Sequence, residues 1–94
     1  MQDENQLLDE RGLSKLRWRC RRGLLENDLF IERFFERYAE TLTVRQAGAL
    51  GVLMDLSDYD LLDLHLARKT LEQVNPGLVR DDVAEIVSML REIR

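Results

Sequence analysis

Residues with the potential to do chemistry gather in one short stretch of this 94-residue chain, residues 17–28. The stretch combines cations and carboxylates with an aromatic side chain and a glycine, which leaves the backbone bare. Charged and aromatic groups of these kinds are common in surfaces that bind other proteins. We therefore expect a partner-binding surface, made by Trp18, Arg21, Arg22, Gly23, Glu26 and Asp28.

The same residues also allow a purely structural explanation. Gly23 can end one helix and open the next, which would make Glu26 the third residue of the new helix. The Glu26 carboxylate could then accept the unpaired backbone N–H of Gly23 and interact with the positive end of the helix dipole. Asp28 argues against this explanation, because it falls on the apolar stripe of that helix, where a hydrophobic side chain is expected.

Enzymatic and metal-binding chemistry finds little support elsewhere in the sequence. Structural zinc requires four Cys or His ligands, whereas this chain has only Cys20 and His65, far apart. We expect Cys20 to be a small apolar residue on a helix face and His65 to be packed or half-exposed. The glycine-rich loops that hold phosphates are missing from the sequence. We therefore expect no enzyme, no metal site and no cofactor of the protein's own.

Charge is distributed unevenly along the chain. The net charge is −4, yet residues 11–22 carry six cations and no acidic residue. Such asymmetry indicates a binding surface without naming its partner. A short basic segment on an acidic protein is a poor match to a dedicated nucleic-acid binder, whose whole domain is commonly basic.

The composition also indicates where the protein works. A single cysteine cannot form an internal disulfide, which suits a reducing compartment. The longest uncharged run is nine residues, 46–54, whereas a membrane span needs about 20. The acidic start of the chain does not resemble a secretion signal. We expect a cytoplasmic monomer that does not insert into membranes.

The elements that must position the charged stretch are helical. We expect residues 1–10 to form a flexible N-terminal extension and residues 11–94 a single domain. The apolar residues of the cationic segment recur at helical spacing until Gly23 interrupts them. A second helix follows, with an apolar stripe made by Leu24, Ile31, Phe35, Tyr38 and Leu42.

A capping-box pattern predicts the third helix. Thr43 and Gln46 have the spacing of such a box, and the helix should continue to about Leu56. Because Gly48 and Gly51 disfavour helix formation, we expect them to permit close packing instead.

Two further helices complete the predicted fold. Ser57 is expected to cap the fourth helix, and residues 75–77 (Asn-Pro-Gly) form a firm stop. Asp81 is expected to cap a fifth helix. The expected buried side of this last helix is formed by Val83, Ile86, Val87, Leu90 and Ile93. We predict an all-α, compact bundle of about five short helices.

The charged stretch resembles a known protein family. Residues 21–28 (RRGLLEND), with residues 34–36 (FFE) and Tyr38 after them, are similar to the succinate dehydrogenase assembly factor 2 family of FAD assembly factors. The similarity runs over about residues 13–63 and continues more loosely into the final helix. The family signature, Arg-Gly-x-x-Glu, is matched by Arg22, Gly23 and Glu26.

The resemblance implies a fold and a function. Members of the family are compact five-helix bundles that bind the flavoprotein subunit of succinate dehydrogenase or fumarate reductase. They promote covalent attachment of FAD to a histidine of that subunit, so the FAD belongs to the partner. The resemblance implies that Arg22, Gly23 and Glu26 form the centre of the contact, with Arg21 and Asp28 beside it.

The sequence departs from the family pattern at three places. Leu64 stands where members often carry a tryptophan, and the connection formed by residues 67–80 is longer than usual. The first ten residues have no counterpart that we can place.

Two other functions stay open at the level of sequence. The chain could be an antitoxin-like or regulatory module that binds a protein other than a flavoprotein. Alternatively, residues 11–22 could act as an RNA- or DNA-binding arm, which would require strongly salt-dependent binding.

Overall fold

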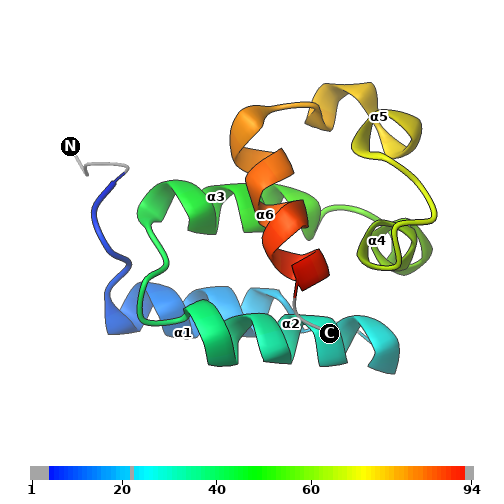
Figure 1. Cartoon of the computed structure of the whole chain (residues 1–94). Coiled ribbons are helices and arrows are strands. Elements are labelled where there is room, and N and C mark those ends of the chain that lie inside the picture. The colour runs from blue at the N-terminus through cyan, green and yellow to red at the C-terminus, as the bar shows by residue number, and fades with distance from the viewer. Residues whose placement is uncertain (1–4, 22, 93–94) are drawn as a thin grey trace.

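The structure is a computed structural model that describes residues 5–21 and 23–92, and helices make up most of this part of the chain (Figure 1). The helices are α1 (Glu10–Arg19), α2 (Leu25–Tyr38), α3 (Val44–Leu53), α4 (Asp58–His65), α5 (Leu71–Val74), the 3₁₀-helix η1 (Pro76–Leu78) and α6 (Asp81–Glu92). Within the described ranges there is no strand, only an isolated bridge between Leu7 and Thr43. The predicted all-α bundle is confirmed. The helix beyond the expected set is α5, a single turn of four residues.

Residues 5–9 lie against the loop between α2 and α3. The N–H of Leu8 donates to the carbonyl of Leu42, and the N–H of Val44 donates to the carbonyl of Gln6, both at 2.9 Å. Asp9 caps α1 by accepting the N–H of Gly12 at 2.7 Å. The helix therefore begins at Glu10, one residue before the predicted domain boundary. The division into a flexible extension and a domain stays a prediction, and residues 1–4 lie outside the described part.

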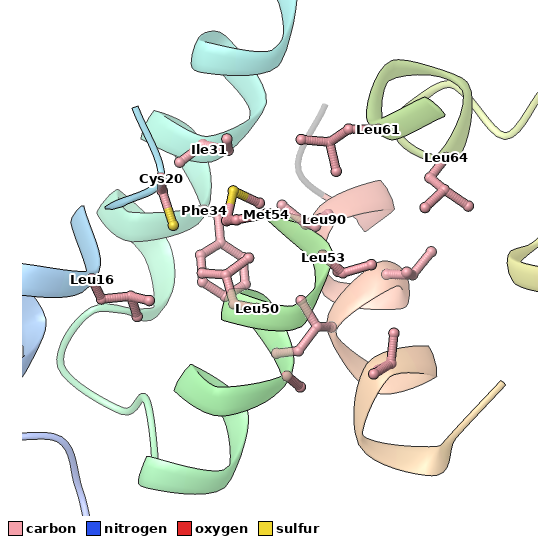
Figure 2. Close-up of a cluster of buried hydrophobic side chains, with 14 of the residues drawn as sticks. Leu16, Cys20, Ile31, Phe34, Leu50, Leu53, Met54, Leu61, Leu64 and Leu90 are labelled. Atoms are coloured by element: carbon pink, nitrogen blue, oxygen red, sulfur yellow. The ribbon is translucent and has the colours of Figure 1, made fainter. Parts of the chain in front are cut away.

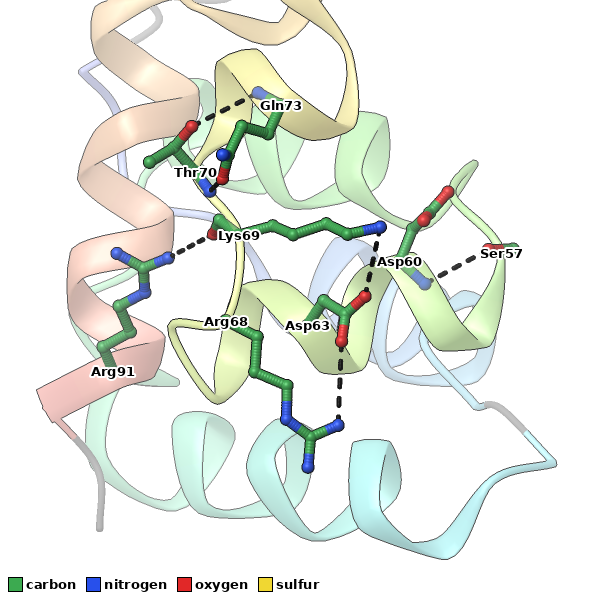
Figure 3. Close-up of polar contacts among 8 residues, drawn as sticks. All are labelled: Ser57, Asp60, Asp63, Arg68, Lys69, Thr70, Gln73 and Arg91. Carbon is green, nitrogen blue, oxygen red and sulfur yellow. Dashed lines mark hydrogen bonds and ion pairs between the residues drawn. The ribbon is translucent and has the colours of Figure 1, made fainter.

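Local capping chemistry sets the start of α3 and α4, as the sequence predicts. Thr43 and Gln46 form the expected capping box, with hydrogen bonds of 3.2 and 3.0 Å. The Ser57 hydroxyl accepts the N–H of Asp60 at 3.2 Å (Figure 3). Both side chains satisfy backbone donors that the first turn of a helix leaves unpaired.

The two glycines of α3 have different environments. Gly51 is buried, and the Arg19 guanidinium lies against it and donates to its carbonyl at 3.2 Å. Gly48 is exposed, and a side chain there would meet nothing within 4 Å. The predicted close packing is therefore confirmed for Gly51 and wrong for Gly48. The helix itself ends at Leu53, three residues before the predicted Leu56.

The long connection between α4 and α6 contains more structure than the sequence suggested. Thr70 and Gln73 form a second capping box, which starts α5 (Figure 3). The predicted stop at residues 75–77 is real, because α5 ends at Val74 and η1 begins at Pro76. Asp81 was expected to cap the last helix, but it is the first residue of α6.

The core forms where α2, α3, α4 and α6 meet (Figure 2). Phe34 and leucines from α3 and α4 are completely or almost completely buried in it. The predicted buried side of α6 is confirmed for Val83, Ile86, Val87 and Leu90, whereas Ile93 lies outside the described residues. Leu64, which replaces the expected tryptophan, is also in the core, so this departure from the family concerns packing.

None of the helices in the described part of the chain is both long enough and apolar enough to cross a bilayer.

Candidate partner-binding surface

The end of α1 presents an aromatic and a cationic side chain to solvent. Trp18 is 73% exposed, although tryptophan is usually largely buried. The Arg21 guanidinium lies over its ring, 5.7 Å from the ring centroid. The chain turns here, because the N–H of Arg21 donates to the carbonyl of Trp18 at 3.3 Å instead of continuing the helix. Two of the predicted site residues thus form one exposed cation–π pair.

Gly23 lies in the open between α1 and α2. It is exposed, and a Cβ atom built there would meet nothing within 4 Å. Its backbone is not in the left-handed region that favours glycine, since no described glycine has a positive φ. Among the described residues, neither backbone conformation nor packing therefore requires a glycine at this position.

Glu26 is exposed in the first turn of α2, but it does not have the predicted capping role. The helix begins one residue later than expected, with Leu24 at the N-cap and no side-chain hydrogen bond capping it. Glu26 is thus the second residue of the helix rather than the third. Its carboxylate faces solvent near the positive end of the helix dipole.

Asp28 lies beside a groove between α1 and α2. The groove has a volume of about 710 Å³ and a floor formed by Cys20, Ile31 and Phe35. Arg17 and Arg21 line it from α1, and the Arg17 guanidinium lies 5.2 Å from the centroid of the Phe35 ring. Carboxylates line it from α2, namely Asp28, Glu32 and Glu36. A partner segment in this groove would therefore meet an apolar floor with opposite charges on its two walls.

The polar residue that α2 buries is Asn27, which the sequence analysis missed. Asn27 is fully buried, whereas Asp28 is half-buried. The Asn27 Nδ2 atom donates to the carbonyl of Asp58 at 2.9 Å, but its Oδ1 atom has no hydrogen-bond partner in the described part of the chain. A buried polar atom without a partner costs about 1–3 kcal/mol. The signal was present in the sequence, because Asn27 precedes the buried Ile31 by four residues and Phe34 by seven.

The two residues considered for enzymatic chemistry are both inside the protein. Cys20 is fully buried beneath the α1–α2 groove. His65 is buried and stacks on Phe30, with ring centroids 4.6 Å apart. Burial, assisted by the nearby Arg91 charge, lowers the pKa of His65 to about 4, so its imidazole is neutral near pH 7. Over the described residues, no group of three His, Cys, Asp or Glu side chains could hold a metal ion.

The structure thus brings most of the predicted site residues to the α1–α2 junction. Trp18, Arg21, Gly23 and Glu26 are exposed there, and Asp28 borders the neighbouring groove. Arg22 lies outside the described residues, so its place in this surface stays a prediction. Their role in binding a partner is likewise a prediction at this point.

Comparison with known proteins decides the family. A family model described as "Flavinator of succinate dehydrogenase" matches residues 14–94. The chain belongs to this flavinator family. The match covers the helices from within α1 onward, and it includes the whole Arg-Gly-x-x-Glu segment. The family resemblance of the sequence is therefore confirmed.

Individual members of the flavinator family agree with this assignment. The chain is 47% identical over 85 residues to the FAD assembly factor SdhE of Ralstonia nicotianae, covering 90% of this chain and 86% of the relative. It is 41% identical over 58 residues to the SdhE of Coxiella burnetii, covering 62% and 71%. The SdhE of Legionella pneumophila is 32% identical over 84 residues, covering 89% and 96%. No solved structure matches the chain significantly.

Proposed function

We propose that this protein is an assembly factor that binds the flavoprotein subunit of succinate dehydrogenase or fumarate reductase and promotes covalent attachment of FAD to it. The observation that carries the proposal is the environment of Gly23. The glycine is exposed and unobstructed, and nothing in the protein's own fold requires it. It also belongs to the Arg-Gly-x-x-Glu segment of a flavinator family member. A bare backbone there would allow a partner surface to approach closely.

The protein would act by organising its partner and not by doing the chemistry itself. Flavin attachment would be the flavoprotein's own reaction, and the FAD would belong to the flavoprotein. Binding would favour the arrangement in which the flavin and its target histidine are in reacting geometry, so that the gain comes from orientation and population shift. The positions of Cys20 and His65 are consistent with this non-catalytic role, because both side chains are buried.

The first test replaces Gly23 with a large residue. Gly23→Arg should keep the helical circular dichroism and thermal stability of the wild type, because Gly23 is exposed and an added Cβ atom would meet nothing described within 4 Å. It should nevertheless abolish covalent flavin on a co-expressed succinate dehydrogenase flavoprotein subunit, measured by in-gel flavin fluorescence, because the arginine would hold the two surfaces apart.

Gly48 offers a matched control for this test. It is also exposed with nothing within 4 Å, but it lies on α3 instead of in the motif. Gly48→Arg should therefore support flavin attachment at the wild-type level. Wild-type flavin attachment with Gly23→Arg would show that the motif surface is assigned wrongly.

We further place the protein in the cytoplasm as a monomer without a nucleic-acid partner. Affinity capture with the tagged chain should recover a yellow, flavin-containing subunit. Recovery of a flavin-free protein instead would favour the antitoxin-like or regulatory alternative. A gel shift with RNA or DNA at low salt would favour the binding arm at residues 11–22.

A further inference from the structure

The helix that carries the motif begins without a side-chain cap. Side chains cap α1, α3, α4 and α5, whereas the N-cap of α2 is Leu24, whose side chain cannot accept a hydrogen bond. The first N–H groups of such a helix lack a capping partner from the N-cap side chain, so the first turn tends to fray. Glu26 is in this turn and Gly23 immediately precedes the N-cap, so fraying would disorder the proposed contact.

One side chain links this uncapped turn to a distant element. Asn27 is the third residue of α2, and its Nδ2 atom donates to the carbonyl of Asp58, the first residue of α4, at 2.9 Å. The acceptor is itself well fixed, because the Ser57 hydroxyl caps α4 at the same point. The hydrogen bond therefore connects the start of α2 to the start of α4, although the two residues are 31 positions apart in sequence.

Packing alone does not account for an asparagine here. The side chain is fully buried, and within the described part of the chain its Nδ2 atom is paired whereas its Oδ1 atom is not. A leucine of similar size would leave no unpaired oxygen in the core, but it would remove the donor to the Asp58 carbonyl. The asparagine thus provides a specific connection between α2 and α4 and leaves one buried oxygen unpaired.

We propose that Asn27 is a positioning residue, which holds the first turn of α2 in the conformation that the partner recognises. This inference rests on the proposed function, because it assumes that the motif surface binds the flavoprotein. Asn27 has no exposed surface and cannot touch a partner, so its effect must pass through Glu26 and Gly23. A partner that meets an ordered turn does not have to order it on binding, which increases affinity.

The test compares the affinity and the local order of variants that keep the fold. Asn27→Leu removes both the hydrogen bond and the unpaired oxygen, and Asn27→Ala does so without any risk of overpacking. Both should keep the native helical circular dichroism. Their affinity for the purified flavoprotein subunit, measured by calorimetry, should fall about tenfold, the order expected from losing one buried hydrogen bond. Amide hydrogen exchange of residues 25–28 should accelerate by a similar factor.

Restoring a local cap should rescue the weakened variant. Leu24 has extended backbone angles, φ −89° and ψ 116°, which suit a capping serine. Leu24→Ser combined with Asn27→Leu should therefore regain most of the lost affinity, while Leu24→Ser alone should bind like the wild type. A double variant that stays as weak as Asn27→Leu would overturn the proposal, since order in the first turn would then not be what the partner needs.

Gly23→Arg in the same binding assay distinguishes failure of the positioning role of Asn27 from failure of the proposed function. If Gly23→Arg loses binding but both Asn27 variants bind like the wild type, the positioning role is wrong and the proposed function stands. If Gly23→Arg binds like the wild type, the motif surface itself is assigned wrongly.

Discussion

At the scale of single residues, most of the described groups proposed to contact a partner are exposed, whereas His65, the buried residue whose pKa is lowered, is not. The exposed set surrounds Gly23, whereas His65 is enclosed and stacked on Phe30. The imidazole has an unpaired Nε2 atom within the described structure, and Arg91 adds a positive charge nearby. Both burial and this charge oppose protonation. His65 is therefore a source of acid sensitivity rather than a proton donor at the surface.

The lowered pKa of His65 predicts that stability falls in mild acid. The unfolded chain binds a proton at this histidine near pH 6.5, whereas the folded protein does so only near pH 4. Between these values the unfolded state binds more protons, so the free energy of unfolding decreases as the pH falls. The loss should approach about 3 kcal/mol by pH 4. Urea unfolding measured from pH 7 to pH 4 gives this value directly.

His65→Leu is the control for this pH dependence. It removes the titrating group but leaves every carboxylate, so the variant should lose less stability than the wild type over the same range. If the free energy of unfolding falls equally in the two proteins between pH 7 and pH 4, His65 is not the cause of the acid sensitivity. Arg33 lines the same shallow pocket as His65 and is present in both proteins, so its charge does not affect the comparison.

At the scale of elements, the starts of α3 and α4 were predictable, whereas the start of the motif helix α2 was misplaced by one residue and the capped helix α5 was not predicted. The capping residues of α3 and α4 lie next to the turns they stabilise, so Thr43, Gln46 and Ser57 reveal them in the sequence. The start of α2 depends on the contact between Asn27 and Asp58, which no local pattern encodes. Glu26 was therefore placed one position wrongly from the sequence, and Asn27 was overlooked. The motif residues were found from their types and family likeness, but their arrangement required the fold.

The end of α4 contains a backbone conformation that its residue does not favour. Ala67 has a φ of 57°, the only positive value among the described non-glycine residues. The N–H of Arg68 donates to the carbonyl of Asp63, and that of Ala67 donates to the carbonyl of Leu64, the pattern that normally ends with glycine. Two hydrogen bonds from the Arg91 guanidinium also support this turn. One is donated to the carbonyl of Leu64 at 2.8 Å and the other to the carbonyl of Lys69 at 3.1 Å, and Figure 3 shows the second.

Replacing Ala67 with glycine should stabilise the protein. Glycine adopts the left-handed conformation without the penalty of a Cβ atom, so the free energy of unfolding should rise by about 1 kcal/mol. Chemical denaturation measures the change. Ala84→Gly is the matched control, because Ala84 is exposed within α6. This substitution should lower the free energy of unfolding by about 1 kcal/mol. A destabilised Ala67→Gly variant would contradict this account of the α4 turn.

At the scale of the whole molecule, the bundle acts as a scaffold that holds one helix junction in place. The central helix α6 packs against α2, α3 and α4, and α1 and α2 lie along one side of the molecule (Figure 1). The all-α class and most helix positions followed from apolar periodicity, because the same residues that repeat at helical spacing form the core. The function did not follow from periodicity. It came from the motif and the family match, and the structure added that Gly23 is unobstructed.

The central claim is that this chain promotes flavin attachment without carrying the flavin itself, and reconstitution from purified components tests it most directly. Succinate dehydrogenase flavoprotein subunit lacking covalent flavin would be incubated with free FAD, with or without the chain, and covalent flavin followed over time by denaturing-gel fluorescence. We predict that the wild-type chain accelerates attachment at least about tenfold, as expected for a gain in orientation, and that no flavin appears on the chain. Equal rates with and without the chain, or flavin bound covalently to the chain, would contradict the account.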